Sequence, residues 1–79
     1  MTRLSELAIG AQGRVLKVHG TDAISIRLME MGMTSGVDVA VIGTAPLGDP
    51  IELELRGYRL SVRRSEAERV EIEPDQTPA

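Results

Sequence analysis

The sequence predicts a mostly β fold: a small, partly closed barrel of about five strands, with one inserted α-helix and a short helical turn. Short stretches of alternating apolar and polar residues, separated by Gly and Pro, recur along the 79-residue chain and are typical of strands. One stretch alone, residues 21–36, has a helical pattern. In so short a chain, closing the sheet on itself buries the apolar strand faces and leaves few exposed edges.

The first elements are expected to be an apolar turn followed by a strand. Leu4 and Leu7, three residues apart, indicate a turn that covers one end of the core. Residues 14–19, RVLKVH, are predicted to form the first strand. The adjacent apolar residues Val15 and Leu16 interrupt its alternation, which indicates a β-bulge.

The predicted helix is a run of about ten residues, close to the usual length. Thr21 is expected to cap its N-terminus, with Asp22 in the first turn, where a side-chain oxygen accepts free N–H groups and negative charge suits the helix dipole. Gly32 is expected to end the helix, because glycine adopts the left-handed conformation without steric cost. Met33 would then contact Leu28, as in a Schellman motif.

This helix has apolar residues on two sides. Ile24, Leu28 and Met31 recur at the spacing of a buried stripe, so this side is expected to pack on the sheet. Ile26 and Met29 lie roughly opposite the stripe and are expected to be exposed.

The middle of the chain is expected to be β structure. Val37, Val39 and Val41 lie on one face of a strand. The loop 44–50, TAPLGDP, follows, and its two prolines and its glycine predict a stiff, exposed connection. Residues 51–63 form the clearest hairpin. Its apolar face consists of Ile51, Leu53, Leu55, Leu60 and Val62.

Two registers fit this hairpin. If Gly57 and Tyr58 form the turn, Arg56 lies opposite Arg59, which places like charges together. If Arg56 and Gly57 form the turn, Glu54 faces Arg59, but Arg56 must adopt a positive φ. Both registers keep the apolar face intact, so the sequence leaves the choice open.

The end of the chain contains one more turn and one more strand. Ser65 and Glu68 are interpreted as a capping box that opens a single helical turn, SEAE. Period-2 alternation resumes in RVEIE, which is predicted to be the last strand. Residues 1–73 are therefore interpreted as one domain, and the polar, proline-containing residues 74–79 as a disordered tail.

Composition argues against several classes of protein. The net charge is −3 and the basic residues are scattered, so the basic patch of a nucleic-acid binder is missing. Tyr58 is the only aromatic residue, which excludes a base-stacking platform. The chain has no Cys, no secretory signal pattern and no apolar run of the ~20 residues that span a membrane. We expect a cytoplasmic protein that does not insert into a membrane.

Residues that carry catalysis or bind metals are not grouped in the sequence. His19 is the sole histidine, whereas iron and zinc sites gather several His, Cys or carboxylate ligands. The chain has no Cys nucleophile, no second His and no G-x-x-x-x-G-K-[ST] phosphate-binding motif. We therefore expect no high-affinity metal site, no cofactor and no enzymatic activity.

Several motifs in combination resemble one protein family. The helix end reads R-L-x-x-M-G-M-x-x-G, the loop after the next strand reads A-P-L-G-D-P, and the hairpin closes in V-R-R before S-E-A. With the opening LSELAIGAQGRV, these stretches resemble the FeoA family, the small cytosolic companions of the bacterial ferrous iron transporter FeoB. Thr34 and Ser35 stand where the family often has a proline. The resemblance implies an SH3-like β-barrel, a role in ferrous iron uptake and contact with FeoB at the cytosolic face.

Exposed apolar residues are the candidates for a partner-binding site in such a protein. Ile26 and Met29, paired on one helical face, are interpreted as a contact surface, since Met packs adaptably against partners. Leu47, at the crest of the 44–50 loop, is either a second partner contact or a leucine folded back over the end of the barrel.

Charged residues are weaker candidates. Arg27 and Glu30 have the spacing of a pair on the helix flank. Arg63 and Arg64 form a small basic spot, which is either plain solvated surface or a site that meets an acidic patch on a partner.

The leading hypothesis is a non-enzymatic accessory protein that binds FeoB, a membrane transporter with a GTP-binding region, and regulates or helps assemble it. One alternative is the SH3-like regulatory domain of a metal-dependent transcriptional repressor. A start at Met1 without DNA-binding helices argues against that interpretation. The other alternative is a homo-oligomeric structural module whose exposed apolar residues pair with each other.

Overall fold

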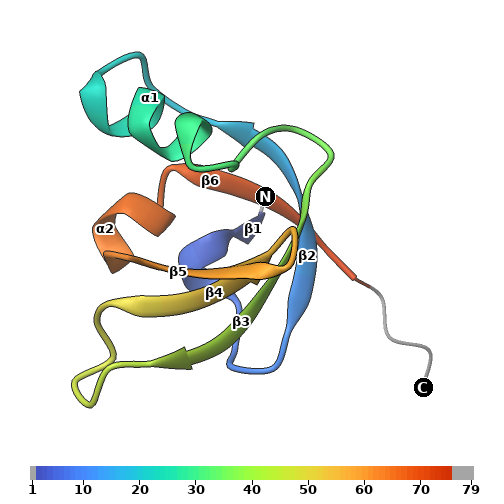
Figure 1. The fold of residues 1–79 in the computed structure, drawn as a ribbon, viewed down its shortest axis with the longest axis vertical. Coiled ribbons are helices and arrows are strands. Elements are labelled where there is room, and N and C mark those ends of the chain that lie inside the picture. The colour runs from blue at the N-terminus through green and yellow to red at the C-terminus, as the bar shows by residue number, and fades with distance from the viewer. Residues whose placement is uncertain (1, 76–79) are drawn as a thin grey trace.

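The computed structural model describes residues 2–75, where six strands form one sheet and short helical segments connect them (Figure 1). In chain order the elements are β1 (Thr2–Arg3), the 3-10 helix η1 (Leu4–Glu6), β2 (Gln12–Val18), α1 (Ala23–Glu30), β3 (Asp38–Thr44), β4 (Ile51–Leu55), β5 (Tyr58–Val62), α2 (Arg64–Ala67) and β6 (Val70–Pro74).

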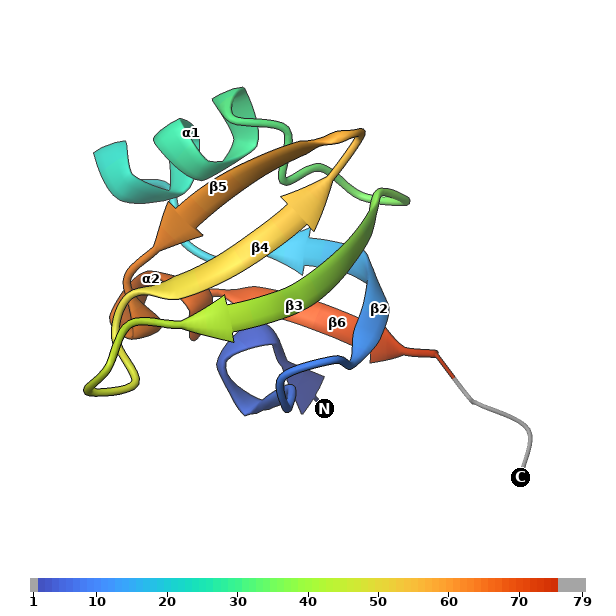
Figure 2. The same cartoon turned by 60° about the horizontal axis from the view of Figure 1, so that its bottom comes forward.

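The strands follow the order β1-β6-β2-β3-β4-β5, and all neighbouring pairs are antiparallel. The sheet curls into a partly closed barrel, with β1 and β5 as its two edges (Figure 2). The predicted mostly β barrel is confirmed. One strand was missed: β1 has only two residues, which is too short to show a period-2 pattern in the sequence.

Alternation along the strands places one sheet face in the core, as predicted. Val37, Val39 and Val41 are all buried beside the strands of the hairpin. The pairing of β2 with β6 shifts register between Val15 and Lys17, which confirms the bulge and leaves the intervening Leu16 exposed. In η1, Leu4 is fully buried and covers one end of the core.

The N-terminus of α1 differs from the prediction by one residue. Asp22 is the N-cap, and its carboxylate accepts a hydrogen bond from the Ser25 N–H at 3.2 Å, whereas Thr21 had been assigned that role. An aspartate at this position accepts the free N–H group and also places negative charge at the positive end of the helix dipole.

The C-terminus of α1 is a Schellman motif, as predicted. Gly32 has φ 107°, in the left-handed region. The Met33 N–H donates to the Leu28 carbonyl at 3.0 Å, and the Gly32 N–H donates to the Met29 carbonyl at 3.1 Å. Met33 and Leu28 are both fully buried in the same core cluster.

The buried side of α1 is not the predicted stripe. Leu28 is buried and Met31 is half-buried, but Ile24 is 36% exposed and Ser25 is buried in its place. Burial of Ser25 costs little because its hydroxyl donates to the His19 carbonyl at 2.6 Å. The helix is therefore rotated toward Ser25 relative to the expectation from apolar spacing alone.

The hairpin of β4 and β5 adopts the second of the two registers. Arg56 and Gly57 form the turn with φ of 51° and 81°, and Leu55 pairs with Tyr58. Positive φ at both central residues defines a type I′ turn, whose twist matches that of the strands. Glu54 lies opposite Arg59, which removes the like-charge pair of the other register.

The short helix α2 is capped differently from the prediction. Its N-cap is Arg63, whose N–H donates to the Glu66 carboxylate at 3.1 Å. The predicted box of Ser65 and Glu68 is therefore wrong. The chain leaves β5 and enters the helix directly, so the acidic residue three positions after the N-cap is Glu66, which is buried, rather than the exposed Glu68.

The last strand, β6, runs through Pro74, and the Asp75 N–H donates to the Gln12 carbonyl at 3.0 Å. The chain is thus tied to β2 beyond residue 73. The rest of the predicted tail, residues 76–79, lies outside the described residues.

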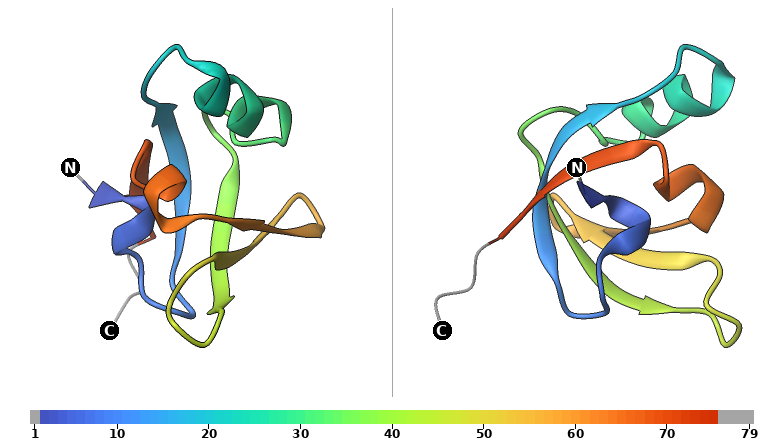
Figure 3. Two further views of the ribbon diagram at one scale, coloured as in Figure 1. Left: turned by 90° about the vertical axis from the view of Figure 1, so that its left-hand side faces the viewer. Right: turned by 180° about the vertical axis from the view of Figure 1, so that it is seen from behind.

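The helices and the 45–50 loop occupy different parts of the molecule. The helix α1 lies at one end of the long axis, above β5, and the loop between β3 and β4 lies at the other end (Figures 1 and 3). The short helix α2 packs beside η1, between these ends (Figure 3). This arrangement decides which candidate residues can act together.

Candidate partner-binding surface

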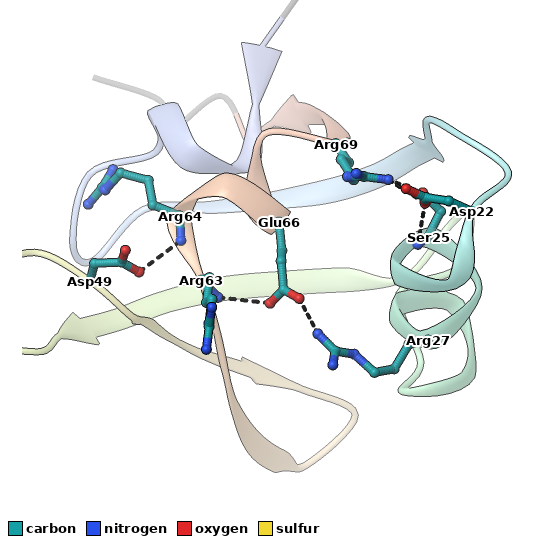
Figure 4. Close-up of polar contacts among 8 residues, drawn as sticks. All are labelled: Asp22, Ser25, Arg27, Asp49, Arg63, Arg64, Glu66 and Arg69. Atoms are coloured by element: carbon teal, nitrogen blue, oxygen red, sulfur yellow. Dashed lines mark hydrogen bonds and ion pairs between the residues drawn. The ribbon is translucent and has the colours of Figure 1, made fainter.

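Polar contacts hold α1 against the barrel at both ends. At its N-terminus the Arg69 guanidinium donates to the Asp22 carboxylate and, at 3.1 Å, to the Ser25 hydroxyl (Figure 4). At its C-terminus the Tyr58 hydroxyl of β5 donates to the Met31 carbonyl. The exposed side of α1 is therefore presented in a fixed orientation relative to the sheet.

These contacts also perturb one titratable group. The hydrogen bond from Arg69 is the main cause that lowers the pKa of Asp22, and the N–H of Ser25 lowers it further, because both donors stabilise the charged carboxylate. The N-terminal attachment of α1 is therefore strongest when Asp22 is ionised.

A buried carboxylate joins α1 to α2. Glu66 is 7% exposed; one of its oxygens accepts from the Arg63 N–H and the other from the Arg27 guanidinium of α1 (Figure 4). The predicted pairing of Arg27 with Glu30 is therefore not observed, because Glu66 is within reach across the fold. This ion pair fixes the spacing between the two helices.

Arg64, one of the candidate partner contacts, is engaged inside the molecule. Its guanidinium donates to the Gly48 carbonyl at 2.9 Å and to the Ser5 carbonyl at 2.9 Å. Its backbone N–H donates to the Asp49 carboxylate at 2.9 Å (Figure 4). Arg64 thus links the 45–50 loop to η1 and α2. These hydrogen bonds restrain the loop further than its two prolines do alone.

An open groove of about 710 Å³ lies between α1, the end of β5 and the loop that precedes β4. It is lined by Arg27 and Met31 of α1, Asp49 and Pro50 of the loop, Ser61 of β5, and Arg63 and Glu66 at the start of α2. The candidate residue Arg63 therefore borders a groove that the sequence did not reveal. Its side chain makes no ion pair within the described part of the chain.

The apolar candidates Ile26 and Met29 are exposed, as predicted, and so is Leu47, for which the sequence left two alternatives open. Ile26 is 48% and Met29 is 40% exposed on α1, and Leu47 is 96% exposed in its loop. The proposal that Leu47 folds back over the barrel is therefore wrong. Ile26 and Met29 share one helix, but Leu47 belongs to the loop at the other end of the long axis (Figure 1).

Sequence reasoning missed Glu66, Tyr58 and Arg69 as organisers of this surface. Their partners lie 27 to 47 residues away in the chain, so no local spacing connects them. The only local signal was at Glu66, which stands three residues after Arg63 and just before an apolar residue.

The described residues hold no metal-binding cluster. His19 lies 2.9 Å from a Glu71 carboxylate oxygen, and residues 2–75 contain no group of three or more His, Cys, Asp or Glu side chains that could hold a metal ion. Within the same range, none of the helices has the length and apolar character needed to cross a membrane.

The fold and this surface define a small SH3-like β-barrel. The structure of FeoA from Stenotrophomonas maltophilia, a zinc complex described as a procaryotic SH3 domain protein, superposes with a TM-score of 0.82 at 34% identity, over 92% of this chain and 91% of that one. The chain belongs to the FeoA family: the model of the FeoA domain matches residues 2–74.

Two further comparisons support the family. The solution structure of FeoA from Chlorobium tepidum has a TM-score of 0.85 at 40% identity and covers 92% of this chain and 70% of that one. A curated relative from Porphyromonas gingivalis is 38% identical over 71 residues, or 90% of this chain. It is a fusion of Fe(2+) transport protein A with the Fe(2+) transporter FeoB, and this chain spans 8% of its length.

The fold also occurs in a manganese-dependent transcriptional repressor. Part of that chain, 36% of it, superposes on 92% of this chain with a TM-score of 0.83, but the sequences are only 13% identical. This likeness shows the shared fold alone.

Proposed function

We propose that this protein is a non-enzymatic accessory protein of ferrous iron uptake that binds FeoB on its cytosolic side and regulates or helps assemble the transporter. The observation that carries the proposal is the Porphyromonas gingivalis relative, in which a matching domain and FeoB form one polypeptide. Covalent linkage holds two modules at high effective concentration, and a separate chain needs a binding surface for the same purpose.

The exposed side of α1 is the main contact in this proposal. Ile26 and Met29 present apolar surface on a helix that is fixed at both ends. Binding through this helix therefore costs little conformational entropy. Met adapts to the shape of an apolar partner surface. Leu47 is a second contact, and because Arg64 anchors its loop, the leucine is presented without a loss of loop entropy.

The two contacts lie at opposite ends of the long axis, so a partner that uses both must extend along the molecule (Figure 1). The groove bordered by Arg63 lies between them. In this proposal Arg63 meets acidic groups of the partner and mainly raises the association rate. Arg64 acts indirectly, since its guanidinium holds the loop that carries Leu47.

Regulation in this scheme follows from differential affinity. The resemblance to the FeoA family implies a partner, FeoB, with a GTP-binding region, and an accessory protein shifts such a switch only if it binds one state more tightly than another. Equal affinity for all nucleotide states would instead make this protein a constitutive assembly factor.

The repressor interpretation has less support than the FeoA interpretation. The family model covers nearly the whole described chain, while the likeness to the manganese-dependent repressor is confined to the fold. Self-association through the exposed apolar residues would appear as a concentration-dependent mass in light scattering.

Charge introduced on the exposed side of α1 tests the proposal. A variant with Ile26→Glu and Met29→Glu is expected to lose at least tenfold in affinity for FeoB while its Tm stays close to that of the wild type. Ile9→Glu is the matched control, because Ile9 is also exposed, at 62%, but belongs to the turn before β2. Unchanged affinity of the double variant would refute the α1 contact.

The role of Leu47 is tested separately. Leu47→Ser removes apolar surface from a side chain that contributes nothing to the core, so we expect unchanged Tm and weaker binding. A lower Tm with unchanged affinity would show that the leucine serves the fold instead.

A further inference from the structure

The strand β5 leaves one row of backbone groups open. It is the last strand in the sheet order, so within residues 2–75 no other strand pairs with its outer edge. In a hairpin with a two-residue turn, the residues that flank the turn form a hydrogen-bonded pair, and such pairs then alternate along the strands. With Leu55 opposite Tyr58, the groups of Tyr58 and Leu60 face β4.

The backbone N–H and C=O groups of Arg59 and Ser61 therefore face away from the sheet. No backbone hydrogen bond joins either residue to another part of the described chain outside the β4–β5 pairing. The next position, Arg63, is already satisfied, since its N–H donates to Glu66. The open edge thus offers two donors and two acceptors at alternate residues, as a strand partner requires.

The groove meets this open edge at Ser61 and continues to Arg63. Arg27 and Met31 of α1 also line it. The Tyr58 contact joins α1 to β5 near the hairpin, and the Glu66 bridge sets the separation of α1 from α2. The groove is therefore a preformed space that opens onto a free strand edge at Ser61, a combination that fits an extended peptide.

The groove is lined by two arginines, Arg27 and Arg63, and by two carboxylates, Asp49 and Glu66. Both carboxylates already accept hydrogen bonds, Glu66 from Arg27 and the Arg63 N–H, and Asp49 from the Arg64 N–H.

The remaining charge on the β5 side is positive. Arg59, Ser61 and Arg63 share one face of the strand, and Arg59 is only loosely paired with Glu54 at 3.9 Å. An added strand lies about 4.8 Å from β5 and about 10 Å from β4, so the carboxylates of β4 are close to one Debye length away. An incoming strand therefore meets the two arginines first.

We propose that the edge of β5 binds an extended acidic segment of a partner protein, which adds a strand at Arg59 and Ser61 and places acidic side chains beside Arg59 and Arg63. A second copy of this chain fits less well. Antiparallel pairing of two β5 strands about Ser61 would place Arg59 of each copy opposite Arg63 of the other, and like charges in that position repel.

This inference does not depend on which protein supplies the segment. The proposed function concerns FeoB, the exposed side of α1 and Leu47, whereas strand addition concerns the backbone of β5; the two proposals share only Arg63. A synthetic peptide tests it without FeoB, so its failure would leave the proposed function standing, and the reverse also holds.

The probe is an N-acetylated, C-amidated peptide of alternating Val and Glu flanked by Thr, and the control peptide has Lys in place of Glu. Titration is followed by amide chemical shifts and by hydrogen exchange. At about 1 mM peptide, a complex with a Kd of about 0.1 mM is about 90% populated, which allows roughly tenfold slowing of amide exchange. We expect the acidic peptide to slow exchange of the Arg59 and Ser61 amides at least tenfold and the Lys peptide to bind at least tenfold more weakly.

Substitutions at Ser61 separate backbone pairing from side-chain contacts. Ser61→Pro removes the outward N–H and is expected to abolish peptide binding, while Ser61→Ala keeps the N–H and is expected to bind like the wild type. Arg63→Gln is expected to weaken binding several-fold. If Ser61→Pro does not fold, a peptide with N-methylated backbone at alternate residues makes the same test on the wild type.

Three outcomes would overturn the proposed strand addition. The first is that the acidic peptide leaves the Arg59 and Ser61 amides unprotected. The others are that Ser61→Pro or the N-methylated peptide binds as tightly as the unmodified pair, or that the Lys peptide binds as tightly as the acidic peptide. A concentration-dependent mass that Ser61→Pro abolishes would assign the edge to a second copy instead.

Discussion

Replacing Glu66 with Ala should show how strongly one buried carboxylate organises this surface. Glu66 is 7% exposed, yet its two oxygens accept from the Arg63 N–H at the start of α2 and from the Arg27 guanidinium on α1. Alanine removes both acceptors at once. It leaves a backbone donor without its partner and frees α1 from α2 (Figure 4).

The expected cost follows from these two contacts. Loss of the carboxylate acceptor at the N-terminus of α2 costs about 1–2 kcal/mol, as for other helix caps and charged hydrogen bonds. The side chain of Arg27 is 57% exposed, so solvent screens its ion pair with Glu66. Loss of this pair therefore adds only about 0.5 kcal/mol to the cost of the substitution. The free energy of unfolding should fall by about 2 kcal/mol, and Tm by roughly 8–16 °C for a domain of this size.

Thermal unfolding followed by circular dichroism measures this effect, with two companion variants. Glu66→Gln keeps an oxygen acceptor and loses only the charge, so its loss should be about half as large. Glu68→Ala is the matched control, because Glu68 is exposed and is the residue that the sequence pattern indicated as the cap. Equal stability of Glu66→Ala and Glu68→Ala, both close to the wild type, would refute the reasoning.

Two further predictions concern the ends of α1. The pKa of Asp22 is lowered by Arg69, so its contribution to stability is present above the ordinary value of 3.8 and is lost as the pH falls through the lowered folded value. Asp22→Asn should therefore show a weaker fall of Tm on acidification below pH 3.8 than the wild type. At the other end, Gly32→Ala would force φ 107° on a residue with a Cβ that lies 2.7 Å from the Tyr58 hydroxyl, and should cost more than 1 kcal/mol in urea unfolding. Gly36→Ala, at φ 90° with no atom within 4 Å of its Cβ, should cost less, and an equal loss would count against the Tyr58 contact.

Local patterns were sufficient for most of the fold. Val39 and Val41 lie on the buried face of β3, and Val37 is buried just before it, as the period-2 alternation of a half-buried strand predicts. The Schellman motif at Gly32 was equally readable, since it depends on residues within six positions of each other. The hairpin register required one more fact, that Arg56 accepts a positive φ and thereby avoids facing Arg59.

Patterns failed where a distant residue decided the outcome. Ile24 matched the apolar stripe better than Ser25, but Ser25 is buried because the His19 carbonyl satisfies its hydroxyl. Arg27 had a partner at helical spacing in Glu30, but it pairs with Glu66 from another element. In each case a contact between segments far apart in the chain outweighs a local preference.

The candidate site was predictable only in part. Exposure of Ile26 and Met29 followed from their place on the helix, whereas the sequence left open whether Leu47 is exposed or folded back over the barrel. The groove at Ser61 could not be foreseen, because it depends on how α1, β5 and the 45–50 loop meet. Only the fold therefore shows that the basic spot at Arg63 borders a groove.

The central claim, that this protein binds FeoB, is tested most directly by calorimetric titration of the full chain against FeoB from the same cell. FeoB is prepared with a GTP analogue, with GDP and without nucleotide. The account predicts saturable binding to FeoB in at least one nucleotide state. Affinities that differ between the states would indicate a regulator, and equal affinities would indicate a constitutive assembly factor. The absence of binding heat in all three nucleotide states, and of any complex by mass in light scattering, would contradict it, provided that both proteins are folded.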